Sequence, residues 1–394
     1  MAEETPFYMT KVECPVCKTA NEYETIKVGA YTESGRDTDF CPTGRTWRNP
    51  RYQAYNPLLY FTATCKSCFY TREFTRDFKE WKSDSYFKTY RQKVIKDQHL
   101  GLLSEPESII RLIGDHLDPK RHPNETAILK LILAIIDERL IDKSSDLDLA
   151  RFYLRIAWIF REMEKEESPN HQSIKGYLIE ADNKLETFKN TVEKLKLRLH
   201  NFENAISEQF SDEHIAPELK SILYPIKDKY DSEIGSIREI GSVLDAKIDA
   251  LEEINEEHKK VALGSNGDMA MAGFHEFGSF YEFLGKIAQK CEGAPKNEKE
   301  ALEYAVICYR RAFEDGRSIE AGNQQLQASY LIAELSRRIG QHEQAKDYFN
   351  TTIRQGQELI YRNKGDRSKT ALARKILELA IEQARLSVSE AKAG

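Results

Sequence analysis

The sequence predicts an α+β protein that is mostly α-helical: a small β-rich module, then helical repeats with an inserted antiparallel coiled-coil hairpin. Three observations lead to this expectation. Cysteines and aromatic residues concentrate in the first 95 residues, a heptad repeat occupies the middle, and the last third is Ala-rich with helical spacing. These changes divide the chain into segments 1–82, 83–171, 172–262 and 263–394.

The first segment is expected to contain strands joined by a long loop. Residues 22–28 alternate as a strand does, and residues 56–64 follow an Asn-Pro turn signal and are rich in aromatic and β-branched side chains. Residues 34–55 contain Gly, Pro, Asp and Asn throughout and predict a structured loop. Such a long loop is uncommon unless it is functional or tied down.

Two Cys-x-x-Cys pairs carry the clearest chemistry, Cys14 with Cys17 and Cys65 with Cys68. Two residues between thiolates let a tight knuckle present both sulfurs to one ion, and two knuckles complete the closed tetrahedral site of structural zinc. We therefore expect one zinc ion in a zinc-ribbon-like module, where metal binding contributes on the order of 10 kcal/mol to folding. A disulfide framework, a redox motif and metal-free packing are the alternatives.

Cys41 is the fifth cysteine of the segment and lies in Arg-Asp-Thr-Asp-Phe-Cys-Pro. It is a candidate nucleophile or metal ligand beside Asp37 and Asp39. A reactive thiol requires a positive environment, whereas two neighbouring carboxylates raise its pKa. The favoured interpretation is that both Asp residues cap turns and pair with Arg36 or Arg45, with Cys41 packed beside the ribbon.

Aromatic and basic side chains of the first segment form a candidate nucleic-acid surface, since zinc ribbons often use such residues for stacking and phosphate contacts. The excess charge of residues 1–95 is only +3 (15 Lys and Arg against 12 Asp and Glu), and small β modules use aromatic residues for their cores. Nucleic-acid binding is therefore the less favoured interpretation. The candidates are Trp47, Arg48, Arg51, Tyr52, Tyr55, Arg72 and Arg76.

The helical segments 83–171 and 263–394 show spacings typical of tetratricopeptide repeats. Small residues let antiparallel helices approach, and aromatic residues fill the groove beside them. A generic helical bundle is the alternative, and residues 369–393 are expected to form a terminal capping helix. The matching residues are Tyr153, Ile156, Ala157 and Phe160; Ala305, Tyr309 and Ala312; and Gly340, Ala345 and Phe349.

Segment 172–262 carries apolar residues at alternating steps of four and three, which predicts a coiled coil. Pro217 and Pro225 bracket an expected break near 211–224, so we expect two antiparallel helices. Folding of both helices back onto the repeats is the alternative. The first run is Ile174, Leu178, Ala181, Leu185, Phe188, Val192, Leu195, Leu199, Phe202 and Ile206. The second is Tyr230, Ile234, Ile237, Leu244, Ile248 and Leu251.

The overall charge and hydropathy limit the classes of partner. The formal net charge is −6, which argues against binding of the whole chain to nucleic acid or anionic membranes. The longest apolar stretch, 131–136, is too short to span a bilayer, and the N-terminal residues lack the features of a secretory signal. We therefore expect a cytoplasmic protein without a membrane partner.

The motifs CPVC, RDTDFCP, NPLLY and CKSC, followed by RIAWIFRE and YLIAELSRRIG, resemble the bacterial family catalogued as domain of unknown function 2225. The resemblance implies a zinc-ribbon-like N-terminus joined to tetratricopeptide-like helices, without an assigned activity. Two departures stand out. Lys18 and Phe69 occupy positions where the family's knuckles usually carry Gly, and segment 172–262 is additional to the usual pattern.

These expectations favour a cytosolic zinc-binding scaffold or adaptor without catalytic activity. The helical repeats and the coiled coil would bind protein partners, and the hairpin could form a homodimer. The alternatives are nucleic-acid binding through the zinc module, and a thiol enzyme that uses Cys41 with Asp37 or Asp39.

Overall fold

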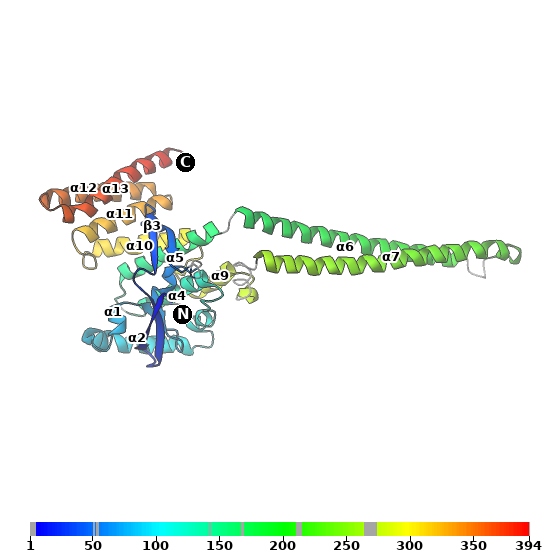
Figure 1. Ribbon diagram of the computed structural model, residues 1–394, viewed down its shortest axis with the longest axis horizontal. Helices are drawn as coiled ribbons and strands as arrows, with labels where there is room; N and C mark the ends of the chain where they lie inside the picture. Colours follow the sequence, from blue (N-terminus) through cyan, green and yellow to red (C-terminus); the bar gives the residue numbers. More distant parts are fainter. Residues whose placement is uncertain are drawn as a thin grey trace. The chain divides into compact units, whose positions relative to one another are not determined.

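The computed structural model describes residues 5–49, 52, 55–141, 143–166, 169–209, 215–263 and 274–393. These residues are mostly helical, with small antiparallel sheets near the N-terminus, which confirms the predicted fold class (Figure 1). The chain divides into two compact units. The first contains Met1–Glu166 and Ala270–Gly394, and the second is Glu167–Met269.

The strands form three two-stranded antiparallel sheets, each a pair of strands close in sequence. The alternation predicted for 22–28 is present in β2, where Asn21 and Tyr23 are buried and their neighbours are exposed. The pairs are β1 (Phe7–Glu13) with β2 (Ala20–Ile26), β3 (Tyr31–Arg36) with β4 (Pro42–Trp47), and β5 (Thr62–Thr64) with β6 (Thr71–Glu73).

Two predictions for this segment need correction. The expected loop 34–55 contains part of the β3–β4 hairpin, whose strands are mostly exposed and therefore lack the apolar alternation that signals a strand. The expected strand 56–64 begins instead with a 3₁₀ turn, η2 (Pro57–Tyr60). Asn56 starts this turn because its side chain accepts the N–H of Leu58 at 2.9 Å, and Pro57 favours the first helical position.

The remaining helical elements of the first unit follow the strands and surround a large apolar core. Helix α4 lies inside this core, with nearly every side chain from Asn124 to Glu138 buried. The elements are α1 (Arg76–Lys79), η3 (Phe87–Arg91), α2 (Gln92–Ser104), α3 (Ile109–Gly114), α4 (Pro123–Arg139), α5 (Asp146–Glu166), η4 (His275–Phe277), α9 (Phe280–Lys290), α10 (Glu298–Asp315), α11 (Asn323–Arg338), α12 (His342–Arg362) and α13 (Arg367–Ala393).

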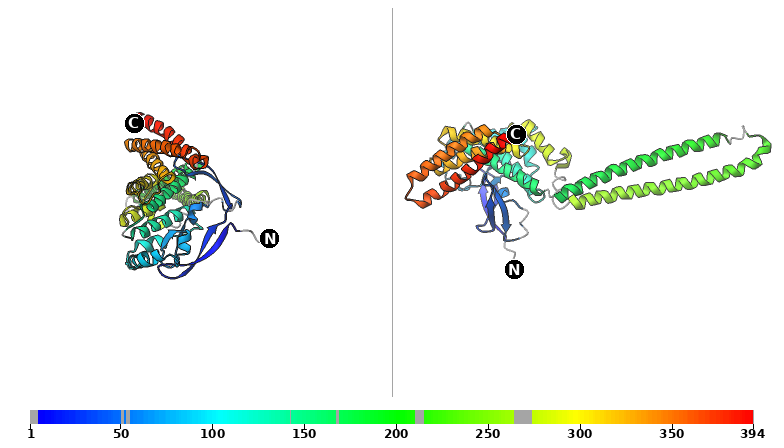
Figure 2. Two further views of the ribbon diagram at one scale, coloured as in Figure 1. Left: turned by 90° about the vertical axis from the view of Figure 1, so that its left-hand side faces the viewer. Right: turned by 90° about the horizontal axis from the view of Figure 1, so that it is seen from above.

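Helices α4, α5, α10, α11, α12 and α13 form one series in which each helix packs against the next (Figures 1 and 2). Helix α5 packs most extensively against α10, although the second unit separates them in sequence. The aromatic rings of Tyr153 and Tyr304 stack between them at 5.1 Å. Of the residues that predicted repeats, Tyr153, Ile156, Ala157 and Phe160 are buried, as are Ala305, Tyr309, Ala312, Ala345 and Phe349.

The second unit consists of two long helices, α6 (Pro169–Gln209) and α7 (Pro217–Leu263), which lie side by side (Figure 2). Ion pairs between them join Lys189 to Glu252 and Lys196 to Asp245. From the first ion pair to the second, the residue number rises by seven on α6 and falls by seven on α7. The two helices are therefore antiparallel.

The expected break between these helices is shorter than predicted. Helix α7 begins at Pro217, where a proline is well tolerated, and it continues through Pro225. The side chains of Ile174, Leu178 and Ala181, which begin the predicted heptad run, lie outside the described residues. In the described ranges, no helix is both long enough and apolar enough to cross a membrane.

Candidate metal centre

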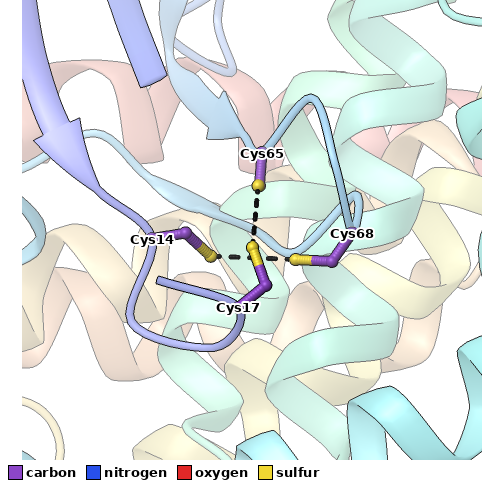
Figure 3. Close-up of side chains that lie close together, drawn as sticks. All are labelled: Cys14, Cys17, Cys65 and Cys68. Carbon is purple, nitrogen blue, oxygen red and sulfur yellow. Dashed lines mark hydrogen bonds between the residues drawn. The ribbon is translucent and has the colours of Figure 1, made fainter. Parts of the chain in front are cut away.

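Four cysteine sulfurs meet between the turn after β1 and the turn after β5 (Figure 3). All four sulfurs lie within 4.8 Å of one another. Cys14 Sγ is 3.7 Å from Cys68 Sγ, and Cys17 Sγ is 3.5 Å from Cys65 Sγ. A tetrahedral site with metal–sulfur bonds of about 2.3 Å separates its sulfurs by roughly 3.8 Å. The cluster can therefore hold one metal ion.

The two knuckles repeat the same backbone geometry. The N–H of Lys18 donates to the carbonyl of Cys14 at 3.0 Å, and the N–H of Phe69 donates to that of Cys65 at 2.9 Å. An N–H group also points at one sulfur in each knuckle, from Val16 to Cys14 and from Ser67 to Cys65, both at 3.4 Å. These bonds orient the sulfurs towards a common centre before any ion is bound.

One residue in each knuckle adopts a backbone conformation that favours glycine. Lys18 has a φ of 67° and Phe69 a φ of 63°, both in the left-handed region. Each such residue costs about 1–2 kcal/mol, and local contacts offset this. The ammonium of Lys18 lies 4.1 Å from the centre of the Trp81 ring, and the ring of Phe69 covers Gly114, where a Cβ would come within 2.3 Å of it.

Asn21 is a buried side chain beside the cluster that the sequence analysis did not identify. Its amide Nδ2 donates to the sulfur of Cys65 at 3.4 Å and to the carbonyl of Thr19 at 2.9 Å. Its Oδ1 accepts the N–H of Lys66 at 3.0 Å. Asn21 therefore ties the first knuckle to the second. Its place in β2 gives no sequence signal for this role.

A buried His–Asp pair supports the second knuckle from the helices. His99 Nε2 lies 2.8 Å from the carbonyl oxygen of Cys68, and Nδ1 lies 2.6 Å from Asp137 Oδ1. Because a carbonyl can only accept, Nε2 carries a hydrogen. Asp137 Oδ2 accepts the N–H of Thr71 at 2.7 Å. Burial alone would lower the pKa of His99, but the hydrogen bond and charge of Asp137, together with the carbonyl of Cys68, outweigh burial and raise the pKa.

We expect Asp137→Asn to weaken metal binding about 10- to 100-fold, as is typical when a residue that supports a metal ligand is changed. The amide lacks the negative charge that favours the protonated His99 ring, so the ring holds the carbonyl of Cys68 less strongly and the turn around Cys68 loosens. Competition with a chromophoric chelator measures the affinity. Asp148→Asn is the matched control, because Asp148 pairs with Arg151 at the protein surface. Equal affinities of both variants would contradict the role of Asp137.

The cluster shares its negative charge unevenly among the sulfurs. Hydrogen bonds with the thiols of Cys14 and Cys68 lower the pKa of Cys65, and the same bonds raise the pKa of Cys14 and of Cys68. Metals bind thiolates rather than thiols, so a bound cation would displace the protons that the other sulfurs hold. All seven cysteines are described, and the structure joins none of them in a disulfide.

Cys41 lies outside this cluster, at the end of the tight turn between β3 and β4. Asp39 is fully buried there and accepts the N–H of Cys41 at 3.2 Å, while Asp37 accepts the N–H of Thr38 at 2.7 Å. Both residues cap the turn, as predicted. Their expected ion partners were wrong, because Arg45 pairs with Glu162 and both Asp residues bind an arginine of α5.

That arginine is Arg161, which holds the turn on the helices. Its guanidinium donates to Asp39 Oδ2 at 2.8 Å, to Asp37 Oδ2 at 3.0 Å and to Glu298 Oε1 at 2.7 Å. Arg338 adds a bond to Asp37 at 2.7 Å. Burial alone would raise the pKa of Asp37, but the Thr38 N–H and both guanidinium groups outweigh it and lower the pKa.

Burial, together with the charge of Asp39, raises the pKa of Cys41 to about 12. We therefore expect native Cys41 to react with iodoacetamide at pH 7.5 roughly a thousandfold more slowly than free cysteine, since only the thiolate reacts. Peptide mass spectrometry measures the rate, and denaturant serves as the control that restores ordinary reactivity. A native rate close to that of free cysteine would contradict this assignment.

Those of the proposed nucleic-acid residues that the structure describes do not form one exposed surface. Trp47 is buried and packs with Phe7, Tyr52 and Tyr55 in a small aromatic core, and its indole N–H donates to the carbonyl of Tyr55 at 3.0 Å. These rings are therefore used for packing, the interpretation that the sequence analysis favoured. Arg48 is exposed, whereas Arg51 and the side chain of Arg76 lie outside the described residues.

A profile of the family described as "Uncharacterized protein conserved in bacteria (DUF2225)" matches residues 7–227 and 250–376. The chain belongs to this family. Its profile covers both knuckles, the helical series up to α13, and most of the second unit. The internal stretch outside the family match is therefore 228–249, so the prediction that all of 172–262 is additional to the family was wrong. No curated protein and no solved structure matches the chain.

Proposed function

We propose that this protein is a zinc-binding scaffold or adaptor of the cytoplasm that binds protein partners and has no catalytic activity. The four-cysteine cluster is the observation that carries this proposal. A site with four protein ligands is closed, because it leaves no position for water or substrate, and closed sites of this kind are structural. Zinc is the ion favoured by four thiolates in a tetrahedral arrangement.

The connection of the cysteine module to the helices supports a scaffold. Besides the contacts of Arg161, Tyr330 donates its hydroxyl to the carbonyl of Thr38 at 2.8 Å, and Phe40 packs on the Tyr330 ring at 5.4 Å. Because Tyr330 lies on α11, this turn reaches the later helices of the series as well as α5. Such a module would be presented to a partner as part of one surface with the helices.

The last two helices offer apolar side chains to such a partner. Tyr361 at the end of α12 is 79% exposed, and Leu372, Leu386 and Val388 of α13 are each at least two-fifths exposed. Leu372 and Leu386 are fourteen residues apart and so lie on the same side of α13, and partner proteins bind helices through apolar residues on one side. Stacked helices also use their outer surfaces for protein binding in other solenoid-like folds.

Affinity capture of the full chain from nuclease-treated extract of its own cells tests this proposal. We expect a near-stoichiometric protein partner whose recovery falls at least fivefold for the double variant Leu372→Glu/Leu386→Glu. Ile307→Glu on α10 is the control, because it changes a similarly exposed apolar residue on another helix. Lack of such a partner, loss of it on nuclease treatment, or equal recovery with both variants would contradict the proposal.

A further inference from the structure

The two helices of the second unit share a narrow buried seam. Val192 of α6 and Ile248 of α7 are 5% and 2% exposed, and Ile234 is 4% exposed. The register set by the ion pairs brings Val192 level with Ile248, and Leu199 level with Gly241. Each helix therefore contributes one row of residues to the seam, and successive residues in a row are seven positions apart.

One flank of this seam is closed by charges. Three ion pairs cross it, Lys189 with Glu252, Lys196 with Asp245, and Arg238 with Glu203. Successive pairs are seven residues apart on each helix, or about 10.5 Å. The charged groups on this flank are therefore neutralised within the hairpin.

The other flank is apolar and exposed. On each helix, the residue directly before each member of these three pairs is Phe, Leu or Ile, and it points about 100° away from its neighbour. Because the helices are antiparallel, this step turns both sets of side chains to the same flank. The apolar flank consists of Phe188, Leu195, Phe202, Ile237, Leu244 and Leu251, which are 36–57% exposed.

This flank is large enough for a stable interface. Ile240 is also 60% exposed and lies beside Leu244 in the helical repeat of α7. With about 200 Å² for an aromatic residue and somewhat less for an aliphatic one, these seven half-exposed residues present roughly 600–700 Å² of mostly apolar surface. Soluble monomers rarely expose more than a few hundred Å² of this kind, and a standard interface buries about 800 Å² on each partner.

We propose that the apolar flank binds the same flank of a second copy of this chain, so that two hairpins form a four-helix bundle. The layers along it favour a symmetric partner. Phe188 lies near Leu251, Leu195 near Leu244, and Phe202 near Ile237. The central layer is therefore a pair of leucines, and each outer layer is one Phe with one aliphatic residue. A twofold axis at the central layer therefore matches each outer layer with a similar one. This inference does not depend on the proposed function.

Sedimentation velocity of the full-length protein over a concentration series tests the proposal. We expect a dimer at micromolar concentration, and Leu195→Glu to raise the dimer dissociation constant at least 100-fold. Leu197→Glu is the matched control with less than a threefold effect, because Leu197 is similarly exposed but points to the outer side of α6.

Circular dichroism and metal content establish that both variants remain folded, and Phe202→Glu provides a second substitution on the flank. A wild-type protein that stays monomeric at 100 μM would overturn the proposal. The same conclusion follows if the dimer is unchanged by both flank variants, or if Leu195→Glu and Leu197→Glu weaken it equally. The scaffold proposal is tested by a separate measurement, partner capture with the α13 variants. The dimer proposal and the scaffold proposal can therefore be refuted independently.

Discussion

Cys65→Ser is expected to abolish stoichiometric metal binding and to unfold the cysteine module. Cys65 has the most contacts in the cluster, since its sulfur lies close to that of Cys17 and accepts from Asn21 and the Ser67 N–H. Structural zinc contributes on the order of 10 kcal/mol to such modules, which is as large as the whole stability of a typical domain. We therefore expect protease sensitivity in residues 5–75, read by mass spectrometry after limited proteolysis.

Cys41→Ser is the matched control for this variant. Cys41 belongs to the same module and is also buried, but its sulfur lies outside the cluster. We expect this variant to keep one metal ion and the proteolysis pattern of the wild type. If Cys65→Ser retained full metal content and protection, or if both variants lost them together, the role of the cluster would be refuted.

Arg161→Met is expected to destabilise the first unit by about 3–5 kcal/mol. The substitution leaves Asp39 as a fully buried carboxylate without a cationic partner, and breaking a buried ion pair from one side has a cost of this size. The indole N–H of Trp158 and the backbone N–H of Cys41 would still donate to Asp39. The expected loss of stability therefore lies within this range and not above it. Denaturation followed by tryptophan fluorescence measures the loss.

All three tryptophans lie before residue 160, so this signal reports the first unit. The double variant Arg161→Met/Asp39→Asn should lose less than the sum of the single variants, because it removes the unpaired buried charge. Arg310→Met is the control and should change stability by at most about 1 kcal/mol, since its pair with Glu314 is exposed. Additive losses in the double variant would contradict a direct Arg161–Asp39 pair.

The four clustered cysteines could be identified from the sequence because the chemistry of a metal site restricts both residue type and spacing. Cys14 with Cys17 and Cys65 with Cys68 satisfy this restriction without any knowledge of the fold. The residues that support them could not be found in this way. His99 and Asp137 lie on two different helices, and His99 reaches a backbone carbonyl that carries no sequence signature.

Dependence on distant helices also explains why the ion partners predicted for the turn between β3 and β4 were wrong. Asp37 and Asp39 have nearby arginines in the sequence, and these were the reasonable candidates. Arg161 and Arg338 are more than 120 residues away and meet the turn only because α5 and α11 are brought together by helix packing. Local sequence predicts turn capping, whereas the choice of a distant ion partner depends on the fold.

For the second unit, the heptad run predicted antiparallel helices but not the exposed flank. A heptad pattern marks both apolar positions as equivalent candidates for the interface. The structure buries one of them, as in Val192, and exposes the other, as in Leu195. The difference depends on the rotation of each helix about its axis, which the ion pairs help to fix and which the spacing alone does not determine.

X-ray absorption at the metal edge, on protein purified without added metal, tests the central claim most directly. We expect one zinc ion per chain with four sulfur neighbours at about 2.3 Å. Nitrogen or oxygen ligands in the first shell, fewer than four sulfurs, or a chain that carries no metal and has disulfides among Cys14, Cys17, Cys65 and Cys68 would contradict it.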